Sequence, residues 1–347
     1  MANIFTYTFF IIGLFLIIKG GDIFVDSATQ AAKMLKIPNF IIGATIVSIA
    51  TTLPEIIVSV QATVTKNVDM AVGNAIGSVT ANTALILGLF ITFMPFEIKR
   101  RDIFFKGISM ILAIISLIIG CVITKKQTLQ FKGESKEYYF LSALGVTLLI
   151  SVFAVFIFEN IKSIKKEVKN DENDKTFTVK EKVLCTVLFI FGAIGIVIGA
   201  RLLVSQGTQI AKNLHISQRV ISVIAVAIGT SLPELVTALS ALKKKSGTLS
   251  AGNILGANII DLTLILPLCS LISIARGSGE LAVSASSVSM DMKICLIVIC
   301  IAVLPTIITQ KFQRWQGILL LLTYVFSKKK KKRGFFPPAS AKLLIFI

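Results

Sequence analysis

Three acidic residues lie deep within long apolar segments of the sequence: Glu55, Glu234 and Asp261. A charged side chain at the centre of a membrane-spanning helix costs at least about 2.5–3.5 kcal/mol. No Lys or Arg lies at comparable depth in the same segments to neutralise these carboxylates. Protonation or a bound cation must therefore balance them. Because the segments offer oxygen ligands and no His, the chemistry favours a hard cation such as Ca²⁺ or Na⁺ over zinc or copper.

A proline directly precedes each glutamate, at Pro54 and Pro233. Proline cannot donate to the carbonyl four residues earlier, and its ring clashes there. We expect each helix to kink or open, which would supply backbone carbonyl oxygens next to a buried carboxylate. The carbonyls expected to be freed are those of Ala50, Thr51, Gly229 and Thr230.

Polar side chains follow these acids at helical spacing. Residues four or seven positions apart share one face of a helix. The rows predicted in this way are Ser48, Thr51 and Glu55; Asn74, Ser78 and Asn82; Thr230 and Glu234; and Asn253, Ala257 and Asp261. Hydrogen bonding between helices also explains Asn74 and Asn253, and close packing explains the glycines beside them.

The rows are two copies of one pattern. Thr51–Glu55 (TTLPE) recurs as Thr230–Glu234 (TSLPE), and Asn82 corresponds to Asp261. The separation in sequence number, here called the repeat offset, is identical for every such pair. The second copy begins five apolar segments after the first, and because five is an odd number, the copies cross the membrane in opposite directions. Such inverted repeats meet near the middle of the bilayer, where secondary transporters bind their substrates.

The elements that must position these residues are membrane helices. The chain has 347 residues, of which 54% are hydrophobic and 16% charged, and this composition excludes a single soluble domain and a disordered chain. About ten segments approach the roughly 20 apolar residues that a spanning helix needs. The predicted fold is an all-α membrane protein of about ten transmembrane helices in a five-plus-five inverted-topology repeat. The predicted parts are a first repeat at 1–161 (motifs 43–88), a linker at 162–182, a second repeat at 183–327 (motifs 222–267) and a basic, irregular tail at 328–347.

Basic residues gather in alternate connections, above all in 99–106, 162–182 and 243–245. The positive-inside rule then predicts a cytoplasmic linker, an N-terminus outside, and a multi-pass protein of the cell (inner) membrane. The net charge of +18 is explained by this topology, so we expect lipid and ions as partners and no nucleic acid. The five cysteines lie in apolar segments without disulfide-type spacing and are expected to be reduced.

At these motifs the sequence resembles the calcium/cation antiporter superfamily, and within it the prokaryotic sodium/calcium exchangers. The resemblance rests on Ala50–Glu55 with Gly73–Asn82, and on Gly229–Glu234 with Gly252–Asp261. It implies exchange of about three Na⁺ for one Ca²⁺ by alternating access, with the first and sixth helices sliding across the core. The transported ions would be bound by Glu55 and Glu234, the Thr51 and Thr230 carbonyls, Asn82 and Asp261, with Ser48, Thr52 and Ser78 toward one outer sodium site and Ala227 and Ser231 toward the other.

Three positions depart from the family pattern. Ala257 replaces a serine, Val79 replaces an asparagine and Ala50 replaces a glycine. The loss of a hydroxyl at Ala257 puts sodium affinity at one outer site in question, and a proton could substitute at an otherwise unpaired carboxylate.

Rival functions are a Ca²⁺/H⁺ exchanger, a passive cation channel and an intramembrane enzyme. The sequence has no GxGD motif for an aspartyl enzyme, and no GxSG motif with a His in a span for a serine enzyme. We therefore expect a transporter without catalytic residues and without a cofactor.

Overall fold

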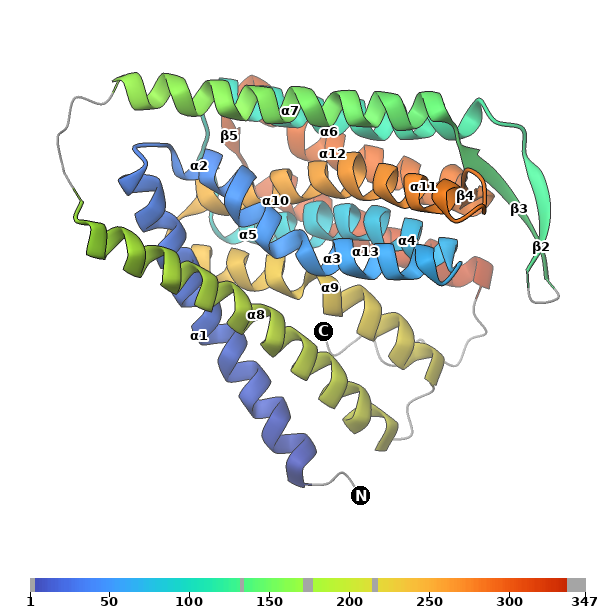
Figure 1. Ribbon diagram of the computed structural model, residues 1–347, viewed down its shortest axis with the longest axis horizontal. Coiled ribbons are helices and arrows are strands. Elements are labelled where there is room, and N and C mark those ends of the chain that lie inside the picture. Colours follow the sequence, from blue (N-terminus) through green and yellow to red (C-terminus); the bar gives the residue numbers. More distant parts are fainter. Residues whose placement is uncertain (1–3, 132–133, 171–176, 214–217, 336–347) are drawn as a thin grey trace.

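The described part of the chain forms ten long helices, and five short strands lie in their connections (Figure 1). The computed structural model describes residues 4–131, 134–170, 177–213 and 218–335. Among these residues, eight helices are long and apolar enough to cross a membrane. The predicted membrane fold of about ten helices in an inverted repeat is confirmed.

Several of the ten helices consist of α-helical parts joined by a wide π turn, labelled η. The first half contains α1 (Ile4–Met34); a helix made of α2 (Asn39–Ile42), η1 (Gly43–Val47) and α3 (Ser48–Val64); a helix made of α4 (Val68–Thr80), η2 (Ala81–Leu87) and α5 (Gly88–Phe93); α6 (Arg100–Val122); and α7 (Ala143–Asn170).

The second half repeats this plan. It contains α8 (Val179–Asn213); α9 (Gln218–Lys243); a helix made of α10 (Gly247–Ile260), η3 (Asp261–Ile265) and α11 (Leu266–Ala275); η4 (Ser287–Asp291) with α12 (Met292–Thr309); and α13 (Arg314–Phe335). The helix at 39–64 and α9 at 218–243 are equally long, and both their beginnings and their ends are separated by the repeat offset.

Two small antiparallel sheets join the halves. β1 (Phe96–Glu97) pairs with β5 (Lys311–Phe312). β3 (Glu134–Leu141) pairs with β2 (Gln127–Phe131) of its own hairpin and with β4 (Leu281–Ser284) of the second half. Each sheet therefore connects a loop of one half to a loop of the other.

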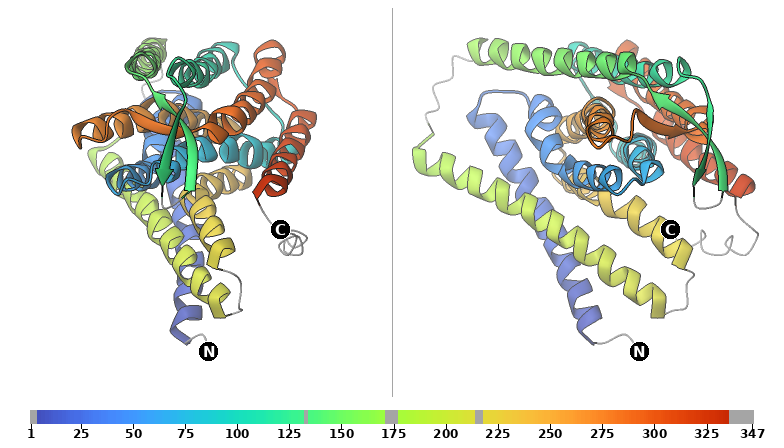
Figure 2. Two further views of the ribbon diagram at one scale, coloured as in Figure 1. Left: turned by 90° about the vertical axis from the view of Figure 1, so that its right-hand side faces the viewer. Right: turned by 45° about the vertical axis from the view of Figure 1, so that its right-hand side comes forward.

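The helices that carry the repeated motifs lie in the middle of the bundle. α6 and α7 run along one side, whereas α1 and α8 cross each other on the opposite side (Figures 1 and 2). α10 is the most enclosed of the motif helices, because all but one of its fourteen residues are buried. The core is thus built around the repeated segments.

Several boundaries differ from the sequence-based expectation. α7 continues to Asn170 and α8 begins at Val179, so helices take up much of the linker expected at 162–182. α13 extends to Phe335, so the first part of the basic tail is helical rather than irregular. In these cases a helix continues past its apolar run into sequence rich in Lys and Glu, which are good helix formers.

Lys106 is a further difference. The sequence places it with the basic connection 99–106, but α6 begins at Arg100 and buries this side chain. The Lys106 ammonium lies over the ring of Phe40, 5.0 Å from the ring centroid. A cation–π contact thus joins α6 to the start of the first motif helix.

Candidate ion-binding site

The three acids predicted from sequence come from helices that pack against one another. α3 carries Glu55, α9 carries Glu234, and η3 begins with Asp261; α3 contacts both α9 and η3. All three side chains are fully buried. The carboxyl groups of Asp261 and Glu234 are close enough to interact electrostatically. The fold thus brings acids from both repeats into one buried region.

Two of these carboxylates are poorly compensated. Both side-chain oxygens of Asp261 are buried without a hydrogen-bond partner among the described residues, and the polar neighbour of the Glu234 carboxylate is the Thr51 hydroxyl, which also donates to Asn253 Oδ1. Both amide atoms of Asn82, which η2 supplies from the first repeat, likewise lack a partner among the described residues. Buried polar groups are normally hydrogen-bonded, and an unpaired buried carboxylate is far more costly than a neutral group. A ligand that balances negative charge is what these oxygens require.

The acids do not form a complete metal site by themselves. Within the described ranges, no three His, Cys, Asp or Glu side chains converge closely enough to hold an ion. Hard cations take six or more oxygens, which include backbone carbonyls and hydroxyls. An ion beside Glu234 must therefore also use neutral oxygens from the neighbouring helices.

Wide turns position the acidic and amide residues. The π turns η2 and η3 begin at Ala81 and Asp261, so Asn82 and Asp261 lie in equivalent turns of the two repeats. Such turns are rare and are frequent at functional sites, because the extra residue re-aims the side chains. The sequence reasoning expected a kink or an opening at Pro54 and Pro233. Both prolines lie inside α-helices, and the helix that carries Pro54 has a π turn of its own, η1, ahead of that proline.

The two asparagines of the motifs hold helices together. Asn253 Oδ1 accepts a hydrogen bond from Thr51 Oγ1 (3.1 Å), and its Nδ2 donates to Thr237 Oγ1 (3.0 Å). In the first repeat, Asn74 Nδ2 donates to the Glu55 carbonyl (3.3 Å). Asn253 therefore links α3 of one repeat to α9 of the other, as expected for an interhelical hydrogen-bond residue.

Among the described residues, a pair of hydroxyl side chains links the repeats on one side and not at the equivalent position on the other. Ser78 Oγ and Ser231 Oγ lie 3.4 Å apart, on α4 and α9. Their equivalents, found by applying the repeat offset in each direction, are Ala257 and Thr52. Alanine offers no hydroxyl, and Thr52 Oγ1 is buried without a partner. The departure seen in the sequence at Ala257 thus has a structural consequence at Thr52.

A second asymmetry lies one residue further along. Asn258 Nδ2 donates to Thr83 Oγ1 of η2 (2.8 Å). The equivalent pair is Val79 and Leu262, and both are fully buried apolar residues. An apolar pair of similar shape needs no hydrogen bond, so the valine at 79 is accommodated by its partner. Asn258 and Thr83 were not singled out from the sequence, and only the broken repeat could have indicated them.

The glycines of the two repeats also have different surroundings. A methyl group at Gly252 would overlap the Phe40 carbonyl, and one at Gly256 would lie 2.7 Å from the Ala44 carbonyl. The equivalents Gly73 and Gly77 are exposed, and a methyl group there would meet no atom within 4 Å. Backbone contact of the first motif helix with α10 is therefore close, whereas the matching face of α4 is uncovered.

The remaining predicted ligands fall into two groups. Thr51, Thr52, Ser48, Ser78 and Ser231 are all buried, and Ser48 Oγ donates to the Thr45 carbonyl (2.9 Å). Ala227 and Thr230 lie on α9, but their side chains are outside the described residues.

Comparison with known proteins agrees with this geometry. Residues 5–162 and 184–327 match the family described as "Sodium/calcium exchanger protein". An uncharacterized membrane protein of Methanocaldococcus jannaschii is 33% identical over 321 residues, covering 92% of this chain and 95% of that one. The sodium/calcium exchanger MaX1 of Methanosarcina acetivorans is 28% identical over 343 residues, covering 91% and 95%.

Solved structures give the same result. A structure of the sodium-calcium exchanger NCX_Mj, soaked with 10 mM Na⁺ and zero Ca²⁺, superimposes with a TM-score of 0.78 at 30% sequence identity. The match covers 94% of this chain and 98% of that chain.

Proposed function

Because the chain belongs to the sodium/calcium exchanger protein family, we propose that it exchanges Na⁺ for Ca²⁺ across the membrane by alternating access, with about three Na⁺ per Ca²⁺. Members of the family are multi-pass membrane transporters and not enzymes. The similarity to MaX1 and to NCX_Mj, which are named as sodium/calcium exchangers, supports the choice of these two ions.

One observation carries the proposal: buried, poorly compensated carboxylates at the meeting point of the repeats. Glu234 and Asp261 interact electrostatically, Asp261 has no hydrogen-bond partner among the described residues, and Glu234 has the Thr51 hydroxyl as its polar neighbour. A divalent ion with oxygen ligands offsets the charge of both, and Na⁺ ions offset the same charge one at a time. One set of oxygens therefore serves either Ca²⁺ or Na⁺.

Shared ligands also explain why transport takes the form of exchange. An empty site would have to carry its uncompensated carboxylates through the change of access, and a buried charge without a partner is costly. A site filled by Ca²⁺ or by Na⁺ avoids that cost. The site then changes the side to which it is open only when one of the two ions is bound, which couples their movements.

The proposed ligand set follows from these positions. Glu55, Glu234 and the carbonyls of Thr51 and Thr230 bind Ca²⁺, while Asn82 and Asp261 border the middle of the site. Ser48, Thr52 and Ser78 lie toward one sodium site, with Ala227 and Ser231 toward the other.

A Ca²⁺/H⁺ exchanger is the second candidate, and Ala257 favours it. The missing hydroxyl leaves Thr52 Oγ1 without a partner and removes one oxygen from the side where a sodium ligand is expected. A proton on a buried carboxyl group balances charge without needing further oxygens. The two candidates therefore differ in the coupling ion and share the Ca²⁺ site.

We further propose the orientation given by the basic residues. The connection between α7 and α8 and the lysines at 243–245 would face the cytoplasm, and the N-terminus would lie outside, in the cell (inner) membrane.

Uptake of ⁴⁵Ca²⁺ into proteoliposomes tests the function. A Na⁺ gradient should drive uptake at constant pH, and a pH gradient should not. Uptake with the pH gradient alone would select the H⁺ exchanger, and uptake by passive flow without any trans ion would indicate a channel.

Two substitutions serve as controls for that assay. Glu55→Gln should abolish uptake, because it removes a proposed central ligand. Glu159→Gln changes a partly buried acid of α7 that lies outside the proposed site, and it should retain uptake.

A further inference from the structure

α1 and α8 cross through glycines that the sequence analysis did not use. Gly13 and Gly20 of α1 recur as Gly192 and Gly199 of α8, again at the repeat offset. A methyl group at Gly20 would lie 3.0 Å from the Ile196 nitrogen, and one at Gly199 would lie 2.8 Å from the Gly13 carbonyl. The two backbones are therefore in direct contact, so these helices must move as one body, here called the α1–α8 pair.

The α1–α8 pair rests against α9. A methyl group at Gly21 would lie 2.5 Å from Val236 Cγ1 and 2.9 Å from Ser240 Oγ, so α1 lies directly on this helix. Val236 and Ser240 are accordingly 7% exposed each.

The equivalent contact on the other side is open. The counterparts of Val236 and Ser240 on α3, at the repeat offset, are Ile57 and Gln61. Ile57 is 50% exposed and Gln61 is also exposed, so the α1–α8 pair does not cover α3 there. The pair occupies one of two equivalent positions on the core.

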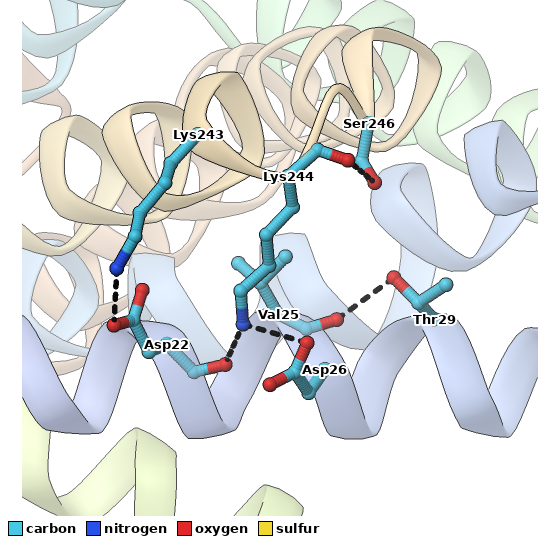
Figure 3. Close-up of polar contacts among 7 residues, drawn as sticks. All are labelled: Asp22, Val25, Asp26, Thr29, Lys243, Lys244 and Ser246. Carbon is cyan, nitrogen blue, oxygen red and sulfur yellow. Dashed lines mark hydrogen bonds and ion pairs between the residues drawn. The ribbon is translucent and has the colours of Figure 1, made fainter.

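Ion pairs hold the pair in this position (Figure 3). Lys243 Nζ lies 3.1 Å from Asp22 Oδ2, and Lys244 Nζ lies 2.6 Å from Asp26 Oδ1. Lys244 Nζ also donates to the Asp22 carbonyl. Lys243 is the last residue of α9 and Lys244 follows it directly, and both aspartates lie on the face of α1 that meets them (Figure 3).

The repeat does not reproduce these charges. The position equivalent to Asp22 is Arg201, and those equivalent to Lys243 and Lys244 are Val64 and Thr65. If the α1–α8 pair moved to the equivalent position on α3, Arg201 would meet no acid there. Among the described residues, Arg201 forms no ion pair. Two attractive contacts thus exist in one position and have no replacement in the other.

We propose that Asp22 and Asp26 with Lys243 and Lys244 form an ion-pair latch that favours one access state of the exchanger. The proposal rests on the proposed function, because the two positions of the α1–α8 pair are taken as its two access states. A contact present in only one state shifts the equilibrium toward that state. The four side chains are positioning residues, since they lie apart from the ion ligands and act through the α1–α8 pair.

Thiol labelling tests the latch without requiring transport. Gln61→Cys, in the full chain in proteoliposomes, is labelled with a membrane-impermeant maleimide on both sides, and the chain without this change gives the background of the native cysteines. Adding Asp22→Asn and Asp26→Asn should slow labelling several-fold, because α8 covers position 61 for a larger share of the time. Lys125→Cys, on an exposed connection far from the latch, should be labelled at one rate in all backgrounds.

Charge exchange separates the latch from general loss of packing. Asp22→Lys combined with Lys243→Asp should restore the labelling rate of Gln61→Cys, and raised ionic strength should imitate neutralisation because exposed pairs are screened. Lys243→Gln with Lys244→Gln provides an independent neutralised variant. Labelling that is unchanged in both neutralised variants would overturn the latch.

Transport measured at the two faces completes the test. In the neutralised variants, the Ca²⁺ concentration for half-maximal transport should rise at one face and fall at the other, whereas damage to the site raises it at both. If labelling responds but no variant transports Ca²⁺, the latch stands and the proposed function fails. If Ca²⁺ is exchanged normally while labelling and both affinities are unmoved, the latch fails alone.

Discussion

Replacing Ala257 by serine tests how the broken repeat affects sodium binding. Thr52 Oγ1 is buried without a partner, whereas its equivalent Ser231 lies 3.4 Å from Ser78 Oγ. When a cation binds the Thr52 oxygen, the O–H points away from the ion and needs an acceptor. Ala257→Ser supplies that acceptor where the other repeat already has one.

The expected gain follows from one buried hydrogen bond. Such a bond contributes about 0.5–1.5 kcal/mol, and about 1.4 kcal/mol corresponds to a tenfold change in affinity. We therefore expect the apparent Na⁺ affinity to rise about two- to tenfold. The affinity for Ca²⁺ should change less, because the central carboxylates are untouched.

The assay is ⁴⁵Ca²⁺ uptake at graded Na⁺ gradients, with two matched variants. Ala251→Ser places a hydroxyl at another fully buried position of α10 and should give no gain. Ala257→Ser in a Thr52→Ala background should also give no gain, because the partner is absent. An equal gain with and without Thr52 would refute the hydrogen-bond reasoning, and an unchanged or lower Na⁺ affinity would place Ala257 outside the sodium site.

Three further predictions test other parts of the structure. Glu234→Gln should abolish Ca²⁺ transport while the protein still elutes as a folded particle, and near-normal uptake would contradict the site. Gly252→Ala should lower stability by about 1–3 kcal/mol through overpacking, whereas the equivalent Gly73→Ala should be tolerated. Thermal unfolding in detergent compares the two variants. Equal losses of stability would argue against the different surroundings of the two glycines. Tyr138 Oη donates to Asp69 (3.0 Å), and burial with the nearby carboxylate raises the pKa of Tyr138 to about 12. Tyr138→Phe should therefore lower the free energy of unfolding by about 1 kcal/mol at every pH below about 10. This difference in stability from the parent should vanish as the pH rises through 12. A loss of stability that varied between pH 6 and 9 would be inconsistent with this pair.

The repeat and its acids were predictable because both depend only on which residue type stands at each position of the sequence. A buried carboxylate is costly in any fold, and the constant repeat offset fixes which residues correspond. The burial of Glu55, Glu234 and Asp261 at contacting helices confirms that part. The assignment of individual ligands remains a prediction.

The turn geometry was not predictable in the same way. Pro54 and Pro233 suggested a kink or an opening, but they did not indicate where the π turns η1, η2, η3 and η4 would form. A π turn forms when packing of neighbouring helices favours the extra residue, so its signal lies in contacts that are distant in sequence. The pairings β1–β5 and β3–β4 were missed for the same reason, because each joins loops from opposite halves.

Assignment of residues from hydropathy was also wrong or uninformative for charged residues near the ends of apolar runs. Lys106 was assigned to a connection because it is charged, but its ammonium lies over Phe40 within the fold. Asp22 and Asp26 follow the first apolar run and gave no reason to expect partners on α9. Pairing of such charges depends on how the helices cross, which composition does not contain.

The loop pairings at β1–β5 and β3–β4 bear on how the polypeptide could be divided. Each sheet bonds a backbone segment of residues 4–170 to one of residues 179–335, and the motif helices of the two parts also interlock through Thr51 and Asn253. The association of the halves is thus secured by contacts that do not depend on the covalent connection between Asn170 and Val179. A chain cut in that connection, or two half-length polypeptides produced together, should assemble into the same ten-helix unit.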